Sequence, residues 1–422
     1  MNIAIIGAGY VGLTCAAVFS KLGHAVHVID SDGHKIIKLS KGLIPFYEPG
    51  LEALVKKGFA NKNLRFTRAY EKAVPNAKVI FLCVGTPPKK NGSPDLSHLF
   101  SAVESLRQHV AKGAVVAIKS TVPAGTAEKV GMRLKNAFMA SCPEFLREGS
   151  AIRDTLHPDR IVIGVNTPEA QKILLAAHER LLGERVVTDL RTAEMIKYAS
   201  NAFLATKISF INEIANLCEE VGANADDIAL GMGLDPRIGK AFLKAGIGYG
   251  GSCFPKDTRA LQSIALSNNY DFQLLKAVIE VNQKQREKFL EKIDKAVGPL
   301  KGKTLGVLGL AFKNNTDDVR ESAAIEICQK LMEKGAAITA FDPQAMANAK
   351  KILPELKTAS RAEEVFHEAD GVIILTEWPQ FTKLPWNTLK NKMAHPIIFD
   401  GRNLLNPGEM GKFGYTYLSV GR

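Results

Sequence analysis

Short apolar runs alternate with longer amphipathic stretches over the first part of the chain. The runs at 2–6, 25–29, 78–84 and 114–119 are apolar without alternation, which is typical of strands buried on both faces of a parallel sheet. Three further runs extend this pattern, at 137–141, 160–165 and 185–188. Helical periodicity follows the first run as far as residue 22 and recurs over 168–182. This order of elements predicts an α/β domain over residues 1–190.

The middle of the chain has helical periodicity only. Residues 192–221 form one amphipathic stretch without an internal breaker, which is longer than a typical helix. A helix of that length bridges domains or packs against its twin in a dimer. Shorter helical patterns follow at 226–232, 237–244, 258–267 and 274–297. We therefore expect a central helical region over 191–300.

The last part of the chain returns to strands and helices. A linker at 299–303 precedes a strand at 304–308, and a helix is predicted as far as residue 334. The spacing from Gly335 to Asp342 repeats the spacing from Gly23 to Asp30, and strands are predicted at 371–375 and 396–399. The predicted fold class is therefore α/β, with two Rossmann-like doubly wound domains, 1–190 and 301–422, joined by a central helical region with one long helix.

Composition narrows the class of protein. Apolar residues make up 46% and charged residues 23% of the chain, which are values typical of a soluble globular protein. No apolar run approaches the roughly 20 residues of a membrane span, and the first strand follows Met1 directly. We therefore expect a cytoplasmic protein with no signal peptide and no membrane partner.

The formal net charge of +12 raises the question of nucleic-acid binding. Lys and Arg are spread over the helical segments, and no basic run or nucleic-acid-binding motif is present. Solvated helix faces account for most of this charge, so we expect no nucleic-acid partner. The remaining positive field would help to collect an anionic substrate such as a nucleotide diphosphate.

The six cysteines show no CxxC spacing, which argues against a disulfide framework and against a metal site. We expect reduced thiols. Five of them stand among apolar or helical neighbours and are expected to be small buried side chains: Cys15, Cys83, Cys142, Cys218 and Cys328.

Cys253 has different surroundings. It follows a run that contains four glycines, Gly246, Gly248, Gly250 and Gly251, and it precedes Pro-Lys-Asp at 255–257. Glycines let the backbone take positive φ and approach a ligand, and Pro255 can begin a helix. Lys256 and the helix N-terminus would then lower the pKa of the thiol from about 8.5 towards neutrality. We interpret Cys253 as an accessible nucleophile, with Asp257 in the first helical turn.

The first strand leads into a glycine fingerprint. Gly7, Gly9 and Gly12 have GxGxxG spacing between a strand and a helix, and Asp30 ends the second strand. Gly7 permits the tight turn, Gly9 the approach of a pyrophosphate to the helix N-terminus, and Gly12 close packing. Because Asp30 would bond the ribose hydroxyls and repel a 2′-phosphate, the predicted cofactor is NAD and not NADP.

Polar residues also follow later strands. Thr86 and Thr121 stand at strand ends, where their hydroxyls can bond the nicotinamide half of a dinucleotide or a water, although a turn or cap role suits Thr86 nearly as well. Glu144 and Glu148 are four residues apart after a strand end and could share one face of a helical turn with acid–base function, although paired surface glutamates are common.

Two polar residues stand within the apolar stripe of the long helix. Lys197 and Asn201 are also four residues apart, so they lie on one face of that helix. They are either a surface lysine with its neighbour or part of a polar site. Spacing alone favours the surface.

These motifs together resemble the UDP-glucose/GDP-mannose dehydrogenase family. The resemblance spans essentially the whole chain and rests on GAGYVG at 7–12, STVPAGT at 120–126, PEFLREG at 143–149, GYGGSCFPKD at 248–257 and GLAFKNNTDDVRES at 309–322. It implies an N-terminal domain that binds NAD, a central helix that forms a homodimer, and a C-terminal domain that binds the nucleotide sugar. It also implies oxidation of the sugar C6 alcohol to a carboxylate by two NAD molecules in succession.

The resemblance carries family roles to individual positions. For the cofactor it implies contacts by Gly7, Gly9, Val11, Gly12, Asp30, Lys35, Thr86, Thr121, Glu148, Lys256 and Arg320. For the nucleotide sugar it implies Glu144, Phe145, Leu146, Arg147, Glu148, Lys197, Asn201, Phe242, Leu243, Lys244, Ala245, Gly246, Gly250 and Lys313, with Arg237 reaching across a dimer interface. The resemblance, and not the spacing, moves Lys197 and Asn201 into the site.

The implied mechanism is covalent. Asp257, through water, or Lys197 takes the proton of the alcohol, and Cys253 then adds to the aldehyde. Lys197, Asn201 and a water held by Thr121 are candidates to stabilise the oxyanion, and Glu144 or Asp257 to activate the hydrolytic water.

Three alternatives remain. A GDP-mannose or UDP-N-acetylhexosamine dehydrogenase shares this chemistry, although residues 242–244 and the unmodified GGSCFPKD favour UDP-glucose as substrate and UDP-glucuronate as product. A two-electron hydroxy-acid dehydrogenase would consume one NAD per substrate. A basic nucleotide-binding module would show no catalysis.

Overall fold

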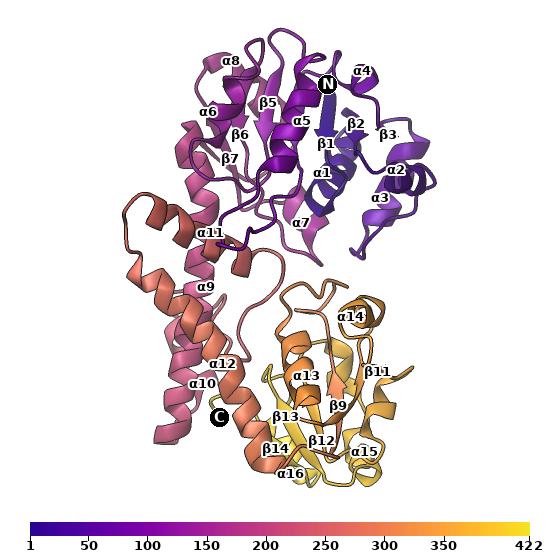
Figure 1. The fold of residues 1–422 in the computed structure, drawn as a ribbon, viewed down its shortest axis with the longest axis vertical. Coiled ribbons are helices and arrows are strands. Elements are labelled where there is room, and N and C mark those ends of the chain that lie inside the picture. The colour runs from indigo at the N-terminus through magenta and orange to yellow at the C-terminus, as the bar shows by residue number, and fades with distance from the viewer. The chain divides into compact units, whose positions relative to one another are not determined.

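The computed structural model describes residues 1–422 and divides into two compact units, Met1–Ser200 and Asn201–Arg422 (Figure 1). The long helix α9 (Leu190–Val221) runs through the boundary between these units. The division into three domains at 190 and 300 stays a prediction.

The first unit is built on an eight-stranded sheet. Its strand order is β3-β2-β1-β4-β5-β6-β7-β8, and every neighbouring pair is parallel except β6 and β7. The strands are β1 (Asn2–Ile6), β2 (Ala25–Ile29), β3 (Leu64–Thr67), β4 (Val79–Leu82), β5 (Val115–Ile118), β6 (Phe138–Ser141), β7 (Arg160–Val165) and β8 (Glu184–Thr188). The order 3-2-1-4-5-6 is that of a doubly wound dinucleotide-binding sheet.

Helices cover both faces of this sheet. They are α1 (Tyr10–Lys21), α2 (Gly33–Ser40), α3 (Leu51–Ala60), α4 (Tyr70–Ala73), α5 (Ser97–Arg107), α6 (Thr126–Gly131), α7 (Ala151–Leu156) and α8 (Pro168–Ala177). Successive strand residues enter opposite cores: Ile3 and Ile5 pack with α1, α3 and α8, whereas Ala4 and Ile6 pack with α5 and α6. Burial on both faces explains why the strands are continuous apolar runs.

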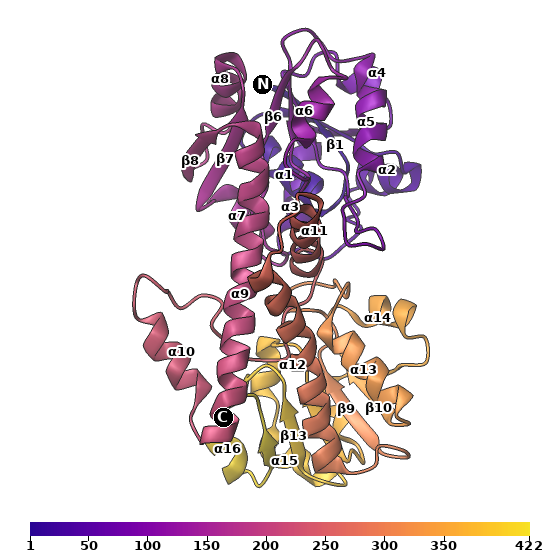
Figure 2. The same ribbon diagram turned by 60° about the vertical axis from the view of Figure 1, so that its left-hand side comes forward.

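The second unit combines a helical part with a second sheet. Its first helices are α10 (Ala225–Gly233), α11 (Phe254–Ser267) and α12 (Gln273–Val297). Figures 1 and 2 both show α12 beside the second half of α9, where Ser209 Oγ donates to the Val278 carbonyl oxygen at 2.9 Å and Asn216 Nδ2 to Gln285 Oε1 at 2.9 Å. Buried polar contacts of this kind fix how the two helices pack.

The second sheet repeats the topology of the first. Its six strands are all parallel in the order β11-β10-β9-β12-β13-β14. They are β9 (Thr304–Leu308), β10 (Ala337–Phe341), β11 (Lys357–Thr358), β12 (Gly371–Ile374), β13 (Ile397–Asp400) and β14 (Thr416–Leu418). Its helical segments are α13 (Ala323–Glu333), α14 (Met346–Ile352), η1 (Ala362–Phe366), η2 (Pro379–Lys383), α15 (Trp386–Leu389), η3 (Lys390–Lys392) and α16 (Pro407–Lys412). The predicted fold class of two Rossmann-like domains with a long central helix is confirmed.

Two predicted helices are wrong in extent or existence. The helix predicted over 237–244 is absent, because Gly239 and Phe242 take positive φ of 71° and 65° and break any regular helix. The helix predicted over 168–182 ends at Ala177. There the Arg185 guanidinium donates to the carbonyl oxygens of His178 and Leu181 and stabilises the helix end.

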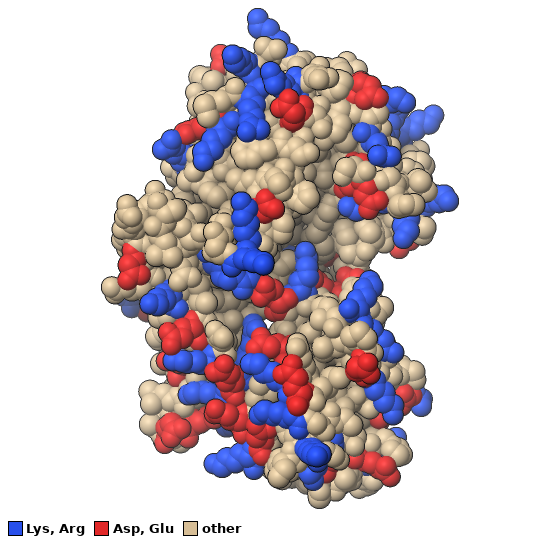
Figure 3. All heavy atoms as spheres, viewed as in Figure 1, with Lys and Arg blue, Asp and Glu red and all other residues tan.

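Composition led us to expect charged, solvated helix faces and no helix that crosses a membrane. On the face of the second unit shown in Figure 3, Lys and Arg side chains alternate with Asp and Glu, as expected for solvated helix faces. None of the helices has the length and apolar composition that crossing a membrane would require.

Candidate active site

The glycine fingerprint forms a tight turn between β1 and α1. Gly7 has φ of 101°, and a Cβ atom there would lie 2.7 Å from the Cys83 carbonyl oxygen. A Cβ on Gly12 would lie 1.9 Å from the Gly7 carbonyl oxygen, so helix and strand pack without room for a side chain. Gly9 is the N-cap of α1, and the space where its Cβ would stand is open. Val11, on the first turn of α1, packs partly buried against the core.

Asp30 follows the adjacent strand β2. Its Oδ2 accepts from the Ala8 backbone N–H at 2.7 Å and from Lys35 Nζ at 3.1 Å, and its Oδ1 accepts from the Asp32 N–H at 3.0 Å. Lys35 lies in the first turn of α2, where its backbone N–H is capped by Asp32. A carboxylate has about four lone-pair positions, so Asp30 can accept one more donor.

This turn fits a dinucleotide. The first N–H groups of a helix lack intrahelical acceptors and favour an anion, and the open space at Gly9 leaves room for a pyrophosphate. Asp30, at the end of the neighbouring strand, has the remaining acceptor position that a ribose hydroxyl needs. The chemistry and the space at this turn therefore suit NAD.

The two threonines meet at the ends of β4 and β5. Thr86 Oγ1 donates to the Thr121 carbonyl oxygen at 2.9 Å, and Ser120 Oγ donates to the Val84 carbonyl oxygen at 2.6 Å. Thr86 is buried, whereas Thr121 is half-buried. The Thr86 hydroxyl proton thus holds the two strand ends together, and its lone pairs stay available for a donor.

The segment that follows β6 is not helical. Residues 142–147 have no regular structure, so the expectation that Glu144 and Glu148 share a face of a helical turn is wrong. The reason is local, because the Glu144 carboxylate accepts from the Leu146 N–H at 2.8 Å and bends the chain. Glu148 is buried separately, near the start of α7.

Glu144 instead pairs with the long helix. Its Oε1 lies 3.0 Å from Lys197 Nζ, and the two side chains are only 9% and 4% exposed. Two cations lie over the Phe145 ring: Lys197 Nζ is 5.3 Å from the ring centre, and the Arg160 guanidinium carbon is 3.8 Å from it. The surface alternative for Lys197 is therefore wrong: the spacing was compatible with both alternatives, and tertiary packing decided between them.

Glu48 is a residue near the candidate site that the sequence did not indicate. This buried carboxylate accepts from the backbone N–H groups of Gly149 at 2.6 Å and Ala151 at 2.8 Å, and from the Tyr10 hydroxyl. It thereby ties the end of the PEFLREG segment to the glycine turn. Arg147, in the same segment, is exposed and forms a bidentate ion pair with Asp154 at 2.7 Å and 3.0 Å.

A cavity of about 390 Å³ lies beneath this segment. Its walls include Glu144, Phe145, Leu146, His178 and Lys119. Lys119 is buried and donates to the Cys142 carbonyl oxygen at 3.2 Å, so it supports the residue that begins the turn to Glu144. Lys119 could not be recognised from the sequence, because a lysine at the end of an apolar strand has no distinctive pattern.

Cys253 is the N-cap of α11. It is half-buried, whereas the other five cysteines are buried as expected. Its carbonyl oxygen accepts from the Asp257 N–H at 2.8 Å, which closes the first helical turn after Pro255. Its sulfur lies 3.7 Å from Ser252 Oγ. A sulfur at a helix N-terminus stands where the helix dipole favours negative charge.

The glycines before Cys253 are needed for packing within the second unit. Gly248 and Gly251 have φ of 87° and 85°, as expected, but Gly246 and Gly250 do not have positive φ. A Cβ on Gly246 would lie 2.8 Å from the Gly401 carbonyl oxygen, and one on Gly250 would lie 2.3 Å from that of Glu321. Their close approach is therefore to the protein's own backbone.

A buried polar network holds this loop. Asn282 donates to the Tyr249 carbonyl oxygen at 3.1 Å and accepts from the Tyr249 N–H at 2.7 Å, and Arg286 donates to the same carbonyl at 2.7 Å. Arg402 donates to the Gly248 carbonyl oxygen at 3.3 Å. The side chains of Asn282, Arg286 and Arg402 were not selected from the sequence, because polar residues on helices and strand ends carry no pattern of their own.

Asp257 and Asn201 form a buried pair. Asn201 Nδ2 donates to Asp257 Oδ2 at 2.6 Å, and Asp257 is 1% exposed. Lys256 Nζ forms an ion pair with the other carboxylate oxygen, Oδ1. The carboxylate beside the cysteine is therefore oriented from both sides, which is what a proton acceptor in a fixed position requires.

The remaining candidates of the second unit lie in three places. Arg237 is exposed and pairs with Asp235 at 2.6 Å. In the loop 242–246, Leu243, Ala245 and Gly246 are buried and Lys244 is exposed, while Gly246 N–H donates to Asn212 Oδ1 at 2.9 Å. Phe242 contacts the ring of Phe254 with ring centres 6.0 Å apart. Lys313 stands 5.7 Å from the ring centre of Phe312, and Arg320 forms a bidentate ion pair with Asp318.

Comparison with known proteins identifies the family of this chain. Three models of the UDP-glucose/GDP-mannose dehydrogenase family match in chain order: its NAD binding domain over residues 1–182, its central domain over 191–284 and its UDP binding domain over 306–407. The chain belongs to the UDP-glucose/GDP-mannose dehydrogenase family. The expected cofactor, NAD, is confirmed, and the first unit contains the family's NAD binding domain.

Relatives in this family match over the full length. UDP-glucose 6-dehydrogenase YwqF of Bacillus subtilis is 47% identical and covers 100% of this chain and 98% of its own. The structure of a UDP-glucose dehydrogenase from Pyrobaculum islandicum superposes with a TM-score of 0.92 at 36% identity over 99% of this chain and 96% of that one. The structure of a UDP-D-ManNAc dehydrogenase from Pyrococcus horikoshii superposes with a TM-score of 0.88 at 28% identity, over 100% of this chain and 99% of that one.

Stability of the first unit is expected to depend on pH through His178. This imidazole packs edge-on against the stacked rings of Phe19 and Phe81, and burial lowers its pKa from 6.5 to about 4. The folded state therefore favours the neutral ring, so the contribution is complete above pH 6.5 and is lost as pH falls towards 4. We expect a loss on the order of 3 kcal/mol in the free energy of unfolding from this residue.

Urea unfolding of the wild type and of His178→Phe at several pH values between 7 and 4 measures this contribution. The variant should show a shallower loss of stability over that range. Equal slopes for the two proteins would contradict the assignment.

Proposed function

We propose that this member of the family oxidises UDP-glucose to UDP-glucuronate, with two NAD and one water consumed for each sugar. The observation that carries the proposal is Cys253 at the N-cap of α11, half-buried, with the buried pair of Asp257 and Asn201 one turn further along. A two-electron oxidation of an alcohol needs no cysteine nucleophile, whereas a thiol that adds to the resulting aldehyde holds it in place for a second oxidation. The full-length similarity to proteins named UDP-glucose 6-dehydrogenase supports the choice of substrate.

NAD, held at the turn of Gly9 and beside Asp30, would supply the hydride acceptor for both oxidations at the sugar C6. Before the first, a protein group takes the proton of the C6 hydroxyl, and Lys197 and Asp257 both remain candidates for this role. An ammonium group cannot accept a proton, so Lys197 would first have to give up one of its own. The Glu144 carboxylate, 3.0 Å away, is placed to take it.

Cys253 then binds the aldehyde. Its sulfur forms a bond to the carbonyl carbon while the thiol proton passes to the carbonyl oxygen, which gives a thiohemiacetal. Loss of a hydride from carbon and of the hydroxyl proton leaves a thioester. Water adds to the thioester carbon, the C–S bond breaks, and the carboxylate and the free thiol are released.

Side-chain roles follow from burial and charge. The Asn201 amide and the Lys197 ammonium are donors that can stabilise an oxyanion, as can a water at Thr121. Glu144 or Asp257 is the acceptor for a proton of the hydrolytic water. In this scheme the buried ion pair of Lys197 and Glu144 keeps both groups in fixed positions.

The yield of NADH per UDP-glucose tests the proposal. With limiting UDP-glucose and excess NAD, we expect two NADH for each sugar, measured by absorbance and by quantifying UDP-glucuronate. One NADH per sugar would contradict the four-electron reaction. A panel containing GDP-mannose and UDP-N-acetylhexosamines decides the sugar, because a higher kcat/KM on one of them would replace UDP-glucose as the substrate.

We also propose that the chain works as a homodimer through α9. Phe203, Phe210 and Leu217 recur every seven residues on this helix and are 66%, 48% and 57% exposed, which is a stripe that a second copy would cover. Sedimentation equilibrium at micromolar concentration should give twice the mass of one chain. A monomer would exclude this role, together with the expectation that Arg237 reaches a partner's substrate.

A cytoplasmic location is part of the same proposal. All six cysteines are free, as expected in a reducing compartment. Fractionation of cells should recover the protein with cytosolic markers, and recovery with an extracytoplasmic fraction would contradict this location.

A further inference from the structure

The turn that follows β13 is organised by one buried carboxylate. Asp400 Oδ1 accepts from the Arg402 N–H at 3.0 Å, and its Oδ2 accepts from the N–H groups of Leu404 at 2.8 Å and Leu405 at 2.9 Å. The Tyr417 hydroxyl donates to the same Oδ2 at 2.7 Å. Four donors, three on Oδ2 and one on Oδ1, hold this carboxylate, so Asp400 defines the conformation of residues 400–405, called the Asp400 turn below.

The Asp400 turn holds the loop that leads to Cys253. The Gly401 carbonyl oxygen accepts from the Ile247 N–H at 3.0 Å, and a Cβ on Gly401 would lie 2.7 Å from Ile247 Cγ2. Arg402 donates to the carbonyl oxygens of Gly248 at 3.3 Å and Phe312 at 3.2 Å. Residues 246–251, called the glycine loop below, are therefore bound to the Asp400 turn a few residues before Cys253.

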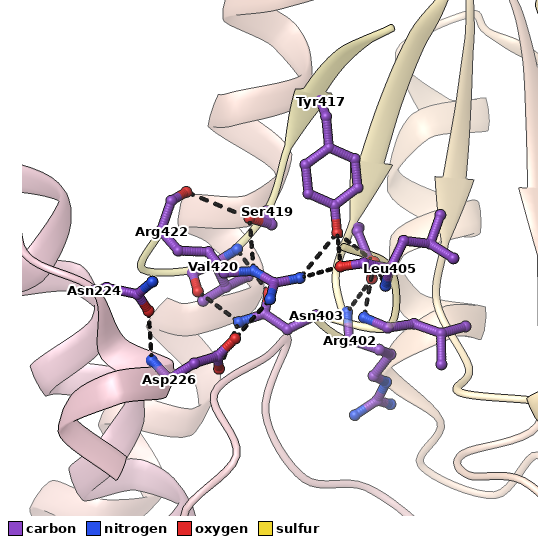
Figure 4. A network of polar contacts seen from close by, with 11 residues as sticks. Asn224, Asp226, Arg402, Asn403, Leu405, Tyr417, Ser419, Val420 and Arg422 are labelled. Atoms are coloured by element: carbon purple, nitrogen blue, oxygen red, sulfur yellow. Dashed lines mark hydrogen bonds and ion pairs between the residues drawn. The ribbon is translucent and has the colours of Figure 1, made fainter. Parts of the chain in front are cut away.

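Arg422 holds the turn from the opposite side. Its guanidinium donates to the Leu405 carbonyl oxygen at 2.7 Å and to the Tyr417 hydroxyl at 3.0 Å, and it pairs with Asp226 at 2.6 Å (Figure 4). Burial, with the charge of Asp400, raises the pKa of Tyr417, so its hydroxyl keeps its proton. Because that hydroxyl accepts from Arg422, its single proton is directed at Asp400 Oδ2, which at 2.7 Å is nearer than the Leu405 carbonyl oxygen at 3.1 Å.

Residues 419–422 are themselves fixed to the helices of this unit. Asn403 exchanges two hydrogen bonds with the backbone of Val420, at 2.8 Å and 3.0 Å. Gly421 N–H donates to Glu219 Oε1 at 2.7 Å, and its carbonyl oxygen accepts from the Ala225 N–H at 2.8 Å. Arg422 thus stands on a rigid base formed by α9 and α10.

We propose that Arg422 and Tyr417 are positioning residues for the reaction: by fixing the Asp400 turn they hold the glycine loop so that Cys253 is presented in its reactive position. This inference rests on the proposed function, because it assumes that Cys253 is the nucleophile. Arg422 and Tyr417 act through Arg402 and Gly401 and not by touching the substrate. Their loss changes the placement of a loop that precedes the thiol.

Tyr417→Phe and Arg422→Ala test the proposal in the full-length protein. Tyr417→Phe removes one hydroxyl and keeps the ring, so it is expected to fold, and it decides the question if Arg422→Ala does not fold. Arg361→Ala is the matched control, because Arg361 lies in the same unit with its side chain 78% exposed and pairs with Glu364 at 3.5 Å. Arg422→Lys keeps the charge beside Asp226 but cannot supply every donor.

The measurements are kcat with UDP-glucose, the Kd of NAD, the melting temperature, and the rate of alkylation of Cys253 by iodoacetamide read by peptide mass spectrometry. We expect both variants to lower kcat about three- to tenfold and to raise the alkylation rate about threefold, since a loosened loop exposes a half-buried thiol but misplaces it. Arg422→Lys should be intermediate, and the Kd of NAD and all values of Arg361→Ala should stay within about twofold.

Two results would overturn the inference. An alkylation rate that is unchanged or lower, or an unchanged kcat, would mean that Arg422 and Tyr417 serve stability alone, even if the melting temperature falls. Cys253→Ala separates this from a failure of the proposed function. If that variant still yields two NADH per UDP-glucose, the covalent scheme is wrong, whereas loss of its turnover beside unaffected Tyr417→Phe and Arg422→Ala refutes the inference only.

Discussion

Replacing Cys253 by serine is expected to lower the rate of UDP-glucuronate formation by about a thousandfold, the scale lost when an enzyme loses its nucleophile. A serine hydroxyl at this N-cap keeps the geometry of α11 but is almost entirely protonated near neutral pH. It also forms an ester that is hydrolysed less readily than a thioester. We therefore expect product to remain bound covalently, detected as a mass increase on the peptide that contains residue 253.

Cys218→Ala provides the comparison for this variant. Cys218 is a free thiol of the same unit but is buried in its core, so its replacement should leave kcat near that of the wild type and lower stability by about 1 kcal/mol. Steady formation of free UDP-glucuronate by Cys253→Ser at a rate near that of the wild type would contradict the covalent scheme.

Replacing Lys197 by methionine is the second change with a large expected effect. The variant leaves the Glu144 carboxylate buried without the ammonium that lies 3.0 Å away, and loss of one partner of a buried pair costs about 3–5 kcal/mol. Activity should fall by about a hundredfold or more, because an oxyanion donor and the orientation of Glu144 are lost together. Urea unfolding and steady-state kinetics measure the two effects separately.

The double variant Lys197→Met with Glu144→Gln distinguishes structure from catalysis. Removing both charges should restore much of the stability, since no unpaired charge then remains buried, but should not restore activity. A double variant that regains activity along with stability would show that the pair serves packing only.

Local sequence was sufficient for the elements in which short-range sterics decide the conformation. The turn of Gly7, Gly9 and Gly12 follows from the lack of room for a Cβ at two of these positions. The start of α11 follows from a proline near a helix N-terminus, which put Cys253 close to that terminus, and the structure makes Cys253 the N-cap. By contrast, β11 and β14 have two and three residues, too short for an apolar run to be recognised.

Sequence alone thus determined most of the strands, the glycine turn, the cysteine near a helix N-terminus and, through motifs at those places, the family. Only the tertiary structure decided what the charged groups face. Asn201 donates to Asp257, which is 56 residues away in the sequence, and Arg402 donates to the Gly248 carbonyl oxygen, which is 154 residues away. Tertiary packing also buries Lys197, for which spacing alone favoured the surface. The physical reason is that backbone preferences are set by adjacent residues, whereas the burial and pairing of a polar side chain depend on chain segments brought together only by packing of the core.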